Sequence, residues 1–168
     1  MSDTAVLILA AGKGERMRSE IPKVLHSLGG KTLLAHVVET AKTLHPKKIV
    51  VLVGHKASLV KEKLAGEKIV FAHQKNQLGT AHAVLCGLES LKKFRGGLLI
   101  LSGDVPLLKP ETLRKMQDLF VSENPSVVLL TGLFDDPSGY GRIVRNRQGE
   151  VVRIVEEKEA QPHEKEIK

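Results

Sequence analysis

The chain has 168 residues, of which 42% are apolar and 27% charged, and its formal net charge at pH 7 is +7. The length predicts one globular domain, and the composition excludes an intrinsically disordered chain. The apolar runs are far shorter than the ~20 residues of a membrane-spanning helix, and the polar start MSDT lacks the features of a secretory signal, so we expect a cytoplasmic protein with no membrane partner.

The positive charge is compatible with a nucleic acid, an anionic membrane or a phosphorylated small molecule as partner. Four phenylalanines and one tyrosine are the only aromatic residues, and no recognition-helix or zinc-finger spacing occurs, which disfavours nucleic acid. Lysines scattered over predicted helix faces, such as Lys42 and Lys61, are interpreted as solvated surface charge. The single cysteine, Cys86, has no second thiol or ligand spacing nearby, so we expect it in the core.

Apolar, β-rich runs alternate along the chain with segments of helical periodicity. The expected strands are 5–11, 48–54, 68–73, 97–102 and 126–133. The alternation among the first four indicates a doubly wound α/β fold, in which a mostly parallel, mixed sheet is sandwiched by helices.

Four amphipathic helices are expected, the first capped by Thr32 and the fourth running from Pro110 to about Ser122. The residues expected to face the sheet are Leu33, Leu34, Val37, Val38, Ala41 and Leu44, then Leu59, Val60 and Leu64, then Ala81, Val84, Leu85, Leu88 and Leu91, and finally Leu113, Met116, Leu119 and Phe120. Beyond them, 141–146 and 150–157 predict an appended β-hairpin. The polar tail 158–168 has too little apolar pattern to predict a further element.

The stretch LAAGKGERMRSEIPKVLH (9–26) places a glycine-rich, cationic loop directly after the first strand. Ligands of open α/β sheets bind at the carboxyl ends of the strands, where glycines let backbone amides approach an anion and cations bind phosphate oxygens. The residues of this kind are Gly12, Gly14, Lys13, Arg16 and Lys23. The loop matches neither GxGxxG nor the Walker A pattern, and a bare GxG is equally compatible with a tight turn whose cations are solvated.

Two further stretches follow expected strands. In QKNQLGTAHAV (74–84), Gly79 permits a close turn, Thr80 can cap the next helix, and the glutamines can pair with a base edge; we expect His82, inside the helix, to be structural. In LSGDVPLL (101–108), Asp104 ends a buried strand and needs a compensating cation. Asp104 is therefore a candidate Mg²⁺ ligand, with a turn or cap aspartate as the alternative.

These stretches, with GYGRIVR (139–145) and IVEEKEA (154–160), occur in an order that resembles the sugar-nucleotide pyrophosphorylases, or NDP-sugar nucleotidyltransferases. The likeness is greatest to the uridyltransferase domains of bacterial bifunctional uridyltransferase/acetyltransferase enzymes. It implies a Rossmann-like nucleotide-diphospho-sugar transferase fold. It also implies formation of UDP-N-acetylglucosamine and pyrophosphate from UTP and N-acetylglucosamine 1-phosphate, for cell-envelope precursors, with Mg²⁺ as cofactor.

The resemblance also implies a role for each matching residue. The expected phosphate-neutralising catalytic residues are Arg16 and Lys23, and the expected metal ligand is Asp104. The expected nucleotide-binding residues are Leu9, Ala10, Ala11, Gly12, Lys13, Gly14, Gln74, Gln77, Gly79 and Thr80. The expected sugar-binding residues are Gly141, through its backbone amide, and Glu156.

The chain departs from the family in two respects. Ser102 stands where close relatives often carry tyrosine, which puts a sugar or base contact in doubt. The family's domain also continues beyond the region that 1–168 matches, with a second metal-binding asparagine, a sugar-contacting asparagine and, in full-length relatives, an acetyltransferase domain through which they self-associate. We therefore expect 1–168 to be the N-terminal part of a nucleotidyltransferase domain, which binds nucleotide and turns over weakly or not at all.

Two other functions stay open at this stage. The first is another sugar-1-phosphate nucleotidyltransferase or a cytidylyltransferase, which would share the glycine loop and the Pro-Lys pair; the QLGTAHAV and GYGRIVR stretches argue against it. The second is a non-catalytic, nucleotide-binding regulatory module, which would bind UTP and form no product.

Overall fold

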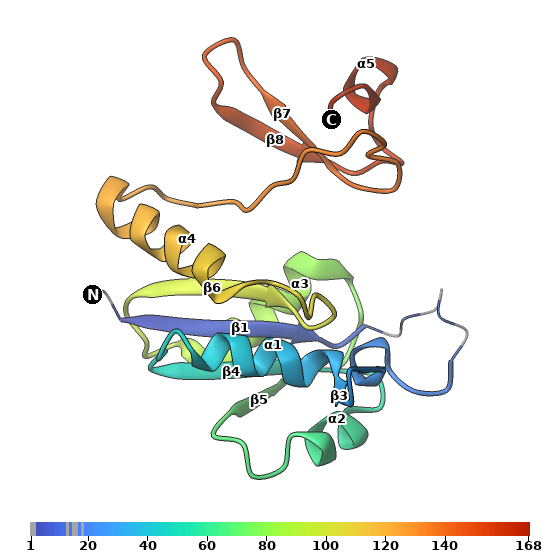
Figure 1. Cartoon of the computed structure of the whole chain (residues 1–168), viewed down its shortest axis with the longest axis vertical. Helices are drawn as coiled ribbons and strands as arrows, with labels where there is room; N and C mark the ends of the chain where they lie inside the picture. Colours follow the sequence, from blue (N-terminus) through green and yellow to red (C-terminus); the bar gives the residue numbers. More distant parts are fainter. Residues whose placement is uncertain (1–2, 13, 15–16, 18) are drawn as a thin grey trace. The chain divides into compact units, whose positions relative to one another are not determined.

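The computed structural model describes residues 3–12, 14, 17 and 19–168. The chain divides into two compact units, Met1–Val128 and Leu129–Lys168 (Figure 1). The first unit holds the sheet and its covering helices, and the second holds a hairpin and a short helix. Within the described residues, no helix is both long and apolar enough to cross a bilayer.

The first unit is built on a four-stranded parallel sheet with the strand order β5-β4-β1-β6. Its strands are β1 (Thr4–Ala10), β4 (Lys48–Val53), β5 (Val70–His73) and β6 (Gly97–Ser102). Strands β1 and β4 are buried on both faces, which explains why their sequences are continuous apolar runs rather than alternating ones. The first four expected strands are confirmed.

Helices cover both faces of this sheet. The helices of the first unit are α1 (Leu33–Lys42), α2 (Ala57–Lys63), α3 (Gly79–Leu88) and α4 (Pro110–Glu123). Helices α1, α2 and α4 pack on the face that carries Val6 and Ile8, and α3 packs on the face that carries Leu7 and Leu52. Helices on both sides of a parallel sheet confirm the doubly wound fold that the periodicity predicts.

Local capping predictions for α1 and α4 are confirmed. The Thr32 hydroxyl accepts a hydrogen bond from the Ala35 amide at 3.1 Å, and Pro110 occupies the first turn of α4. A short hairpin, β2 (Ser27–Leu28) and β3 (Lys31–Thr32), precedes α1. These local signals act within a few residues, so the sequence determines them reliably.

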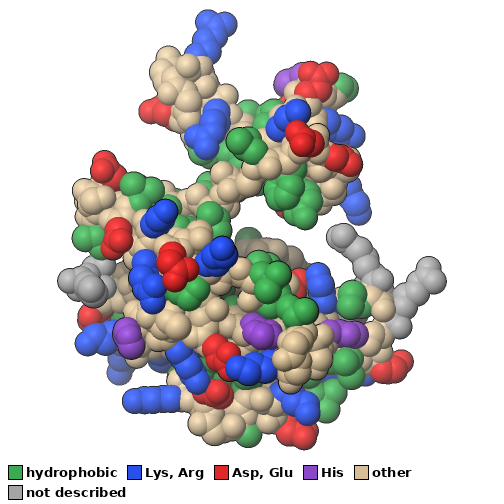
Figure 2. Space-filling view, viewed as in Figure 1, with side chains coloured by type: hydrophobic (Ala, Val, Ile, Leu, Met, Phe, Trp, Pro, Cys, Tyr) green, Lys and Arg blue, Asp and Glu red, His purple; other side chains and the backbone are tan. Residues whose placement is uncertain are grey.

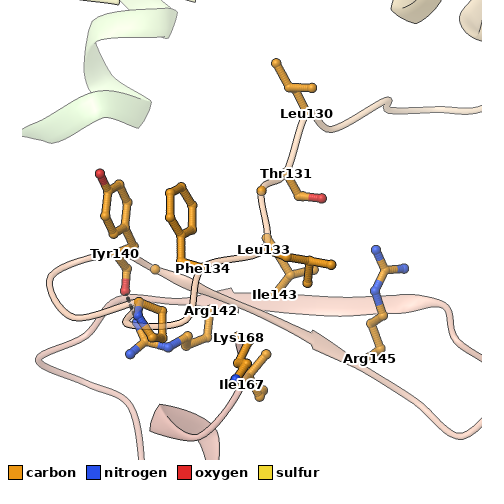
Figure 3. A pocket seen from close by; sticks show the side chains of 13 residues that line it. Leu130, Thr131, Leu133, Phe134, Tyr140, Arg142, Ile143, Arg145, Ile167 and Lys168 are labelled. Carbon is orange, nitrogen blue, oxygen red and sulfur yellow. Dashed lines mark hydrogen bonds between the residues drawn. The ribbon is translucent and has the colours of Figure 1, made fainter.

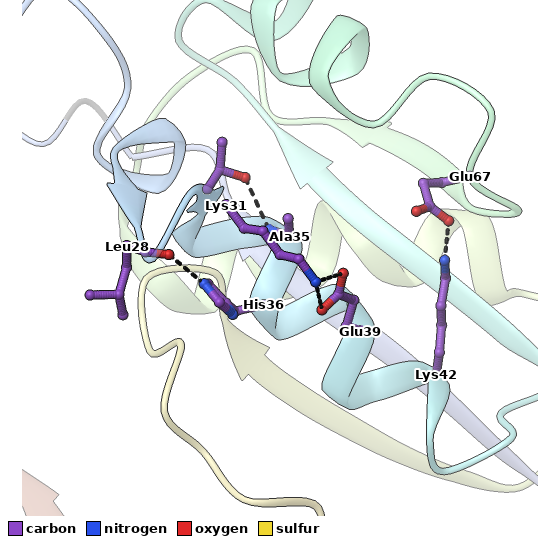
Figure 4. Close-up of polar contacts among 8 residues, drawn as sticks. Leu28, Lys31, Ala35, His36, Glu39, Lys42 and Glu67 are labelled. Atoms are coloured by element: carbon purple, nitrogen blue, oxygen red, sulfur yellow. Dashed lines mark hydrogen bonds and ion pairs between the residues drawn. The ribbon is translucent and has the colours of Figure 1, made fainter.

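The outer face of α1 is a network of polar contacts (Figure 4). Lys31 Nζ lies 2.8 Å from Glu39 Oε1, His36 Nε2 lies 2.8 Å from the Leu28 carbonyl oxygen, and Lys42 pairs with Glu67. The ion pair with Lys31 lowers the pKa of Glu39 below its ordinary value. Basic and acidic side chains are likewise interspersed on the face shown in Figure 2. Lys42 is thus a paired surface lysine, in line with its interpretation as surface charge.

The predicted apolar stripe of α3 is wrong in part: Leu91 and Val84 pack in the core as expected, whereas Ala81, Leu85 and Leu88 are exposed. Leu85 is 63% exposed, whereas Ala83 and Gly87 face the core. A Cβ at Gly87 would lie 2.5 Å from Leu7 Cδ1, so only glycine lets the helix approach β1 this closely. Hydrophobicity patterns miss such a face because its small residues carry little apolar area.

The fifth expected strand, 126–133, is also absent from the described structure, and these residues form neither helix nor strand. Val127 and Leu133 are 66% and 89% exposed. A strand needs a neighbouring strand for its backbone hydrogen bonds, and β-rich composition alone does not supply one.

The second unit contains the predicted hairpin, formed by β7 (Arg142–Arg145) and β8 (Val151–Val155) in antiparallel pairing. The expectation that the tail forms no further element is wrong, because Pro162–Lys165 form α5. The helix begins with a capping box in which the Gln161 amide donates to Glu164 Oε2 at 2.9 Å. Polar capping, rather than an apolar stripe, therefore stabilises this element.

Candidate functional site

The described candidate residues of the first unit gather at the carboxyl edge of the sheet. Parallel strands all end at the same edge, so the segments that follow β1, β5 and β6 lie together there. The Gly103 amide donates to the Leu9 carbonyl at 2.9 Å, and the Gln74 amide donates to the Val53 carbonyl at 2.8 Å. These bonds fix the start of the 101–108 and 74–84 stretches to the ends of β1 and β4.

Lys23 and Asp104 form an ion pair at this edge. Lys23 Nζ lies 2.7 Å from Asp104 Oδ2, and the two side chains are 44% and 30% exposed. Lys23 opens a single-turn 3₁₀ helix, Lys23–Leu25, whose Val24 and Leu25 are buried in the core. The pair thus joins two stretches that lie some eighty residues apart in the sequence, and both charged groups remain accessible to a ligand.

The position of Lys23 depends on Gly14 and Pro22. Gly14 has a φ of +66°, and a Cβ placed there would lie 2.8 Å from Lys23 Cβ. Pro22 precedes the 3₁₀ helix with a φ of −53° and a ψ of 140°. A glycine is therefore required where the loop folds back against Lys23, which is a different role from the anion approach that the sequence suggested. Lys13 and Arg16 lie outside the described residues.

The loop between β5 and α3 is attached to the end of β1. Gln77 Nε2 donates to the Ala11 carbonyl at 2.8 Å, and the His55 amide donates to the same oxygen at 3.3 Å. Gly12 and Ala11 follow β1 directly, so the structure brings Gln77 to the backbone segment that the sequence assigns to nucleotide binding. The Gln77 side chain supports the loop through this bond.

Gln74 is the most buried polar candidate, with 4% of its surface exposed. Its Nε2 group lies 3.3 Å from the Gly79 carbonyl oxygen and 3.0 Å from His82 Nδ1. The prediction that Thr80 caps α3 is wrong, because the N-cap is Leu78 and its side chain makes no capping bond. Helix α3 begins at Gly79, whose φ is +89°. Thr80 is therefore already inside the first turn, where it is exposed.

The sequence did not single out Lys56, which holds the distal part of the glycine-rich loop. Its ammonium group donates to the Glu20 carbonyl and lies 3.1 Å from Glu20 Oε2. Lys56 adopts left-handed backbone angles at the start of α2. No residue pattern near Lys56 predicts this contact. It forms because β1 pairs with β4, which brings the segments after these two strands together.

The two sugar-binding candidates are neighbours within the second unit. A Cβ at Gly141 would lie 3.8 Å from Glu156 Oε2, so the carboxylate and the Gly141 backbone border the same space. Gly141 also lines a cavity of about 590 Å³, together with the stacked rings of Phe134 and Tyr140, 4.9 Å apart (Figure 3). The second unit can therefore present a carboxylate, a bare backbone and aromatic surface within a short distance.

The donor set around Asp104 fits Mg²⁺ only as a partial site. Within the described ranges, no group of three or more His, Cys, Asp or Glu side chains is arranged to hold a metal. Magnesium commonly binds one or two carboxylates, with water and substrate phosphates completing its octahedron. A single accessible aspartate beside the glycine-rich loop would meet that requirement if the loop binds the phosphates of a nucleotide, as the sequence predicts.

The model of the MobA-like NTP transferase domain family matches residues 6–155 of this chain. Over all 168 residues the chain is 47% identical to the bifunctional protein GlmU of Caldanaerobacter subterraneus subsp. tengcongensis, of which it covers 36%. The chain thus spans about a third of the length of the curated relatives it matches.

Solved structures share the fold at lower identity. UDP-glucose pyrophosphorylase complexed with UDP-glucose superposes with a TM-score of 0.71 and 23% identity over 92% of this chain and 69% of that chain. Rv0371c from Mycobacterium tuberculosis H37Rv, solved in complex with manganese, gives 0.59 and 21% over 70% of this chain and 59% of that one. The Rossmann-like nucleotidyltransferase fold is confirmed.

Proposed function

The chain belongs to the MobA-like NTP transferase domain family, and we propose that it carries the nucleotide-binding part of an N-acetylglucosamine-1-phosphate uridyltransferase. Its likeness to GlmU over its full length supports this assignment. The observation that carries the proposal is the Lys23–Asp104 pair beside the glycine-rich loop. The ammonium group of Lys23, which can bind phosphate, thus lies at hydrogen-bond distance from the Asp104 carboxylate, which can bind a metal.

The proposed reaction joins two phosphorylated substrates. A phosphate oxygen of N-acetylglucosamine 1-phosphate attacks the α-phosphorus of UTP, the bond from that phosphorus to the bridging oxygen of the β-phosphate breaks, and pyrophosphate leaves with the electron pair. The protein contributes positioning and charge neutralisation rather than a covalent intermediate. Lys23 neutralises phosphate oxygens, and we assign the same role to Arg16 and an auxiliary one to Lys13.

Asp104 would hold Mg²⁺ against the nucleotide phosphates. Bound there, the ion supplies charge neutralisation to the triphosphate and the leaving pyrophosphate. The manganese complex of Rv0371c supports a divalent ion in this fold. Only Oδ2 of Asp104 contacts Lys23, so the second carboxylate oxygen would be the one to hold the ion while Lys23 faces the phosphates.

The nucleoside would bind at the ends of β1 and β5. We assign it to Leu9, Ala10, Ala11, Gly12 and Gly14 on one side and to Gln74, Gln77, Gly79 and Thr80 on the other. The glutamines supply the hydrogen-bonding groups that a uracil edge requires, and the glycines leave its approach unobstructed. The sugar is assigned to the Gly141 amide and the Glu156 carboxylate of the second unit.

Calorimetry with UTP and Mg²⁺ tests the proposal directly. Wild-type protein binds UTP, and Lys23→Ala weakens binding about tenfold to a hundredfold, since a charged hydrogen bond to phosphate is lost. The matched control is Lys115→Ala, which removes an exposed lysine of α4 and leaves the affinity unchanged. Equal affinities for wild type and Lys23→Ala contradict the phosphate role, and tighter binding of CTP or dTTP than of UTP moves the assignment to another nucleotidyltransferase.

A further inference from the structure

The side-chain amide of Gln74 has one orientation that satisfies its neighbours. The group that lies 3.3 Å from the Gly79 carbonyl oxygen must be the NH₂, because a carbonyl oxygen only accepts hydrogen bonds. The same NH₂ lies 3.0 Å from His82 Nδ1. Both of its hydrogens are therefore used, one toward Gly79 and one toward His82.

This orientation determines the protonation of His82. Nδ1 accepts the hydrogen bond from Gln74 and carries no proton, so the neutral ring has its proton on Nε2. Nε2 lies 3.6 Å from Cys86 Sγ, one turn further along α3, where sulfur serves as a weak acceptor. The hydrogen bonds among these three side chains thus have one consistent direction: Gln74 donates to His82, and His82 donates to Cys86.

The oxygen of the same amide remains available to a ligand. Within the described part of the chain, Gln74 Oε1 has no hydrogen-bond donor. It is not among the buried side-chain atoms without a hydrogen bond, which are His26 Nε2, Arg142 Nε and Glu157 Oε2, the last of which is in an ion pair with Arg142. Oε1 therefore retains some exposure and is free to accept a hydrogen bond, although Gln74 as a whole is only 4% exposed. Rotation of the amide would present NH₂ instead, at the loss of both bonds to Gly79 and His82.

We propose that His82 is a positioning residue that makes the site select uracil over cytosine, because it holds Gln74 with its oxygen toward the base. The inference rests on the proposed function, in which Gln74 lies against the nucleobase. His82 touches neither the substrate nor a reacting atom and acts only through Gln74. The sequence suggested no more than a structural role for it.

The chemistry of the two bases explains the selection. Uracil presents an N3–H donor at the centre of its pairing edge, and Oε1 accepts from it. Cytosine presents an unprotonated N3 at the same place, so two acceptors would face each other without a hydrogen. Sites built on buried polar groups discriminate strongly against such a mismatch. Thymine shares the N3–H of uracil, so this device does not separate those two bases.

The test compares UTP and CTP affinities, measured by calorimetry in the presence of Mg²⁺, for wild type, His82→Phe and His82→Asn. Phenylalanine keeps a ring and removes the acceptor, whereas the asparagine Oδ1 places an acceptor near the position of Nδ1. We expect His82→Phe to lower the ratio of the CTP to the UTP dissociation constant about tenfold, and His82→Asn to restore most of it. Thermal unfolding of each variant establishes that it is folded.

The outcomes separate this inference from the proposed function. If wild type does not bind UTP, the proposed function fails, and this inference fails with it. If wild type prefers UTP but His82→Phe keeps the full ratio, His82 has no positioning role while the uridyl assignment stands. Equal losses with Phe and Asn also overturn the inference, because they attribute the effect to packing rather than to the acceptor.

The tautomer of His82 gives a readout that is independent of ligand binding. In ¹⁵N-labelled protein, long-range proton–nitrogen spectra of the imidazole should show a neutral ring protonated at Nε2, with Nδ1 as the acceptor. The tautomer protonated at Nδ1 would overturn the inference, because Nδ1 would then be unable to accept from Gln74. Because this measurement uses the wild-type protein, it tests the inference even if the His82→Phe variant does not fold.

Discussion

The two units of this chain place candidate ligand-binding residues on very different supports. In the first unit, Gln74 and Asp104 follow strands and Lys23 opens a 3₁₀ helix. These elements are anchored in two apolar clusters, one on each face of the sheet. In the second unit, Gly141 directly precedes and Glu156 directly follows a two-stranded hairpin whose outward residues, such as Val152 and Ile154, are exposed. An apolar core therefore supports the residues proposed to bind the nucleotide, and a polar network supports the residues proposed to bind the sugar.

The polar network of the second unit centres on two buried side chains. Arg142, 3% exposed, lies 2.8 Å from Glu157 Oε2 and donates to the Tyr140 and Lys165 carbonyls. Glu164 is buried, pairs with Arg153 and caps α5. Such networks are directional and sensitive to charge, whereas apolar packing depends on volume. The two units should consequently fail under different perturbations.

The largest expected effect follows from a change in the apolar core of the first unit. Leu34→Ala empties a fully buried position between α1 and the sheet, so it should reduce the free energy of unfolding of the first unit by about 3 kcal/mol. Urea denaturation measures the change, and Leu85→Ala, at a position of the same unit that is 63% exposed, is the control expected to change it by under ~0.5 kcal/mol. Similar losses in both variants would show that the assigned core does not dominate stability.

Removing one charge from the polar network should destabilise the second unit. Arg142→Met leaves the Glu157 carboxylate without its partner, which should cost the second unit about 2 kcal/mol, less than a fully buried pair because Glu157 is partly exposed. Faster hydrogen exchange of the β7 and β8 amides would measure this loss of stability. Arg145→Met removes a neighbouring exposed arginine and should leave exchange nearly unchanged. Unaltered exchange in Arg142→Met would mean that apolar contacts also hold this unit.

A backbone change tests how the first unit positions Lys23. Gly14→Ala combines a φ of +66° with a Cβ 2.8 Å from Lys23 Cβ, so it should destabilise the first unit by about 1 kcal/mol. Gly12→Ala is the matched control for stability, since a Cβ there meets no atom within 4 Å. Thermal unfolding compares the two, and equal melting temperatures would contradict the close approach of the loop to Lys23.

The smallest expected effect is a pH dependence of the stability of α5 in the second unit. The Gln161 amide and then Arg153 lower the pKa of Glu164 below its ordinary value. Because the folded state favours the carboxylate, its stabilisation is complete above the ordinary glutamate pKa and is lost as the pH falls through the lowered one. Exchange protection of α5 should decline below about pH 5 in wild type.

The matched variants for this pH dependence are Glu164→Gln and Glu159→Gln. Glu164→Gln should be less protected at neutral pH and change less on acidification, because it has no carboxylate to protonate. Glu159 is exposed, so Glu159→Gln should follow wild type. A wild-type profile that stays flat into acid would show that the capping box contributes nothing to the stability of α5.

Much of the fold was predictable because it depends on local or periodic signals. The apolar runs that form β1 and β4, the Thr32 cap and the start of α4 at Pro110 all appear where the sequence indicates. The candidate ligand positions were predictable as well, since carboxyl ends of parallel strands share an edge. The roles assigned to them stay predictions.

What the sequence determined by itself is the four strands of the sheet, the helices that cover it, the β7–β8 hairpin and the residue types that follow each strand, because periodicity and capping act over a few residues. Only the tertiary structure decided which groups meet: Lys23 with Asp104, Gln77 with the Ala11 carbonyl, and His82 with Gln74. These contacts depend on strand order and on close helix approach at small residues such as Gly87. Both follow from packing distant segments at van der Waals distance, which no local pattern specifies.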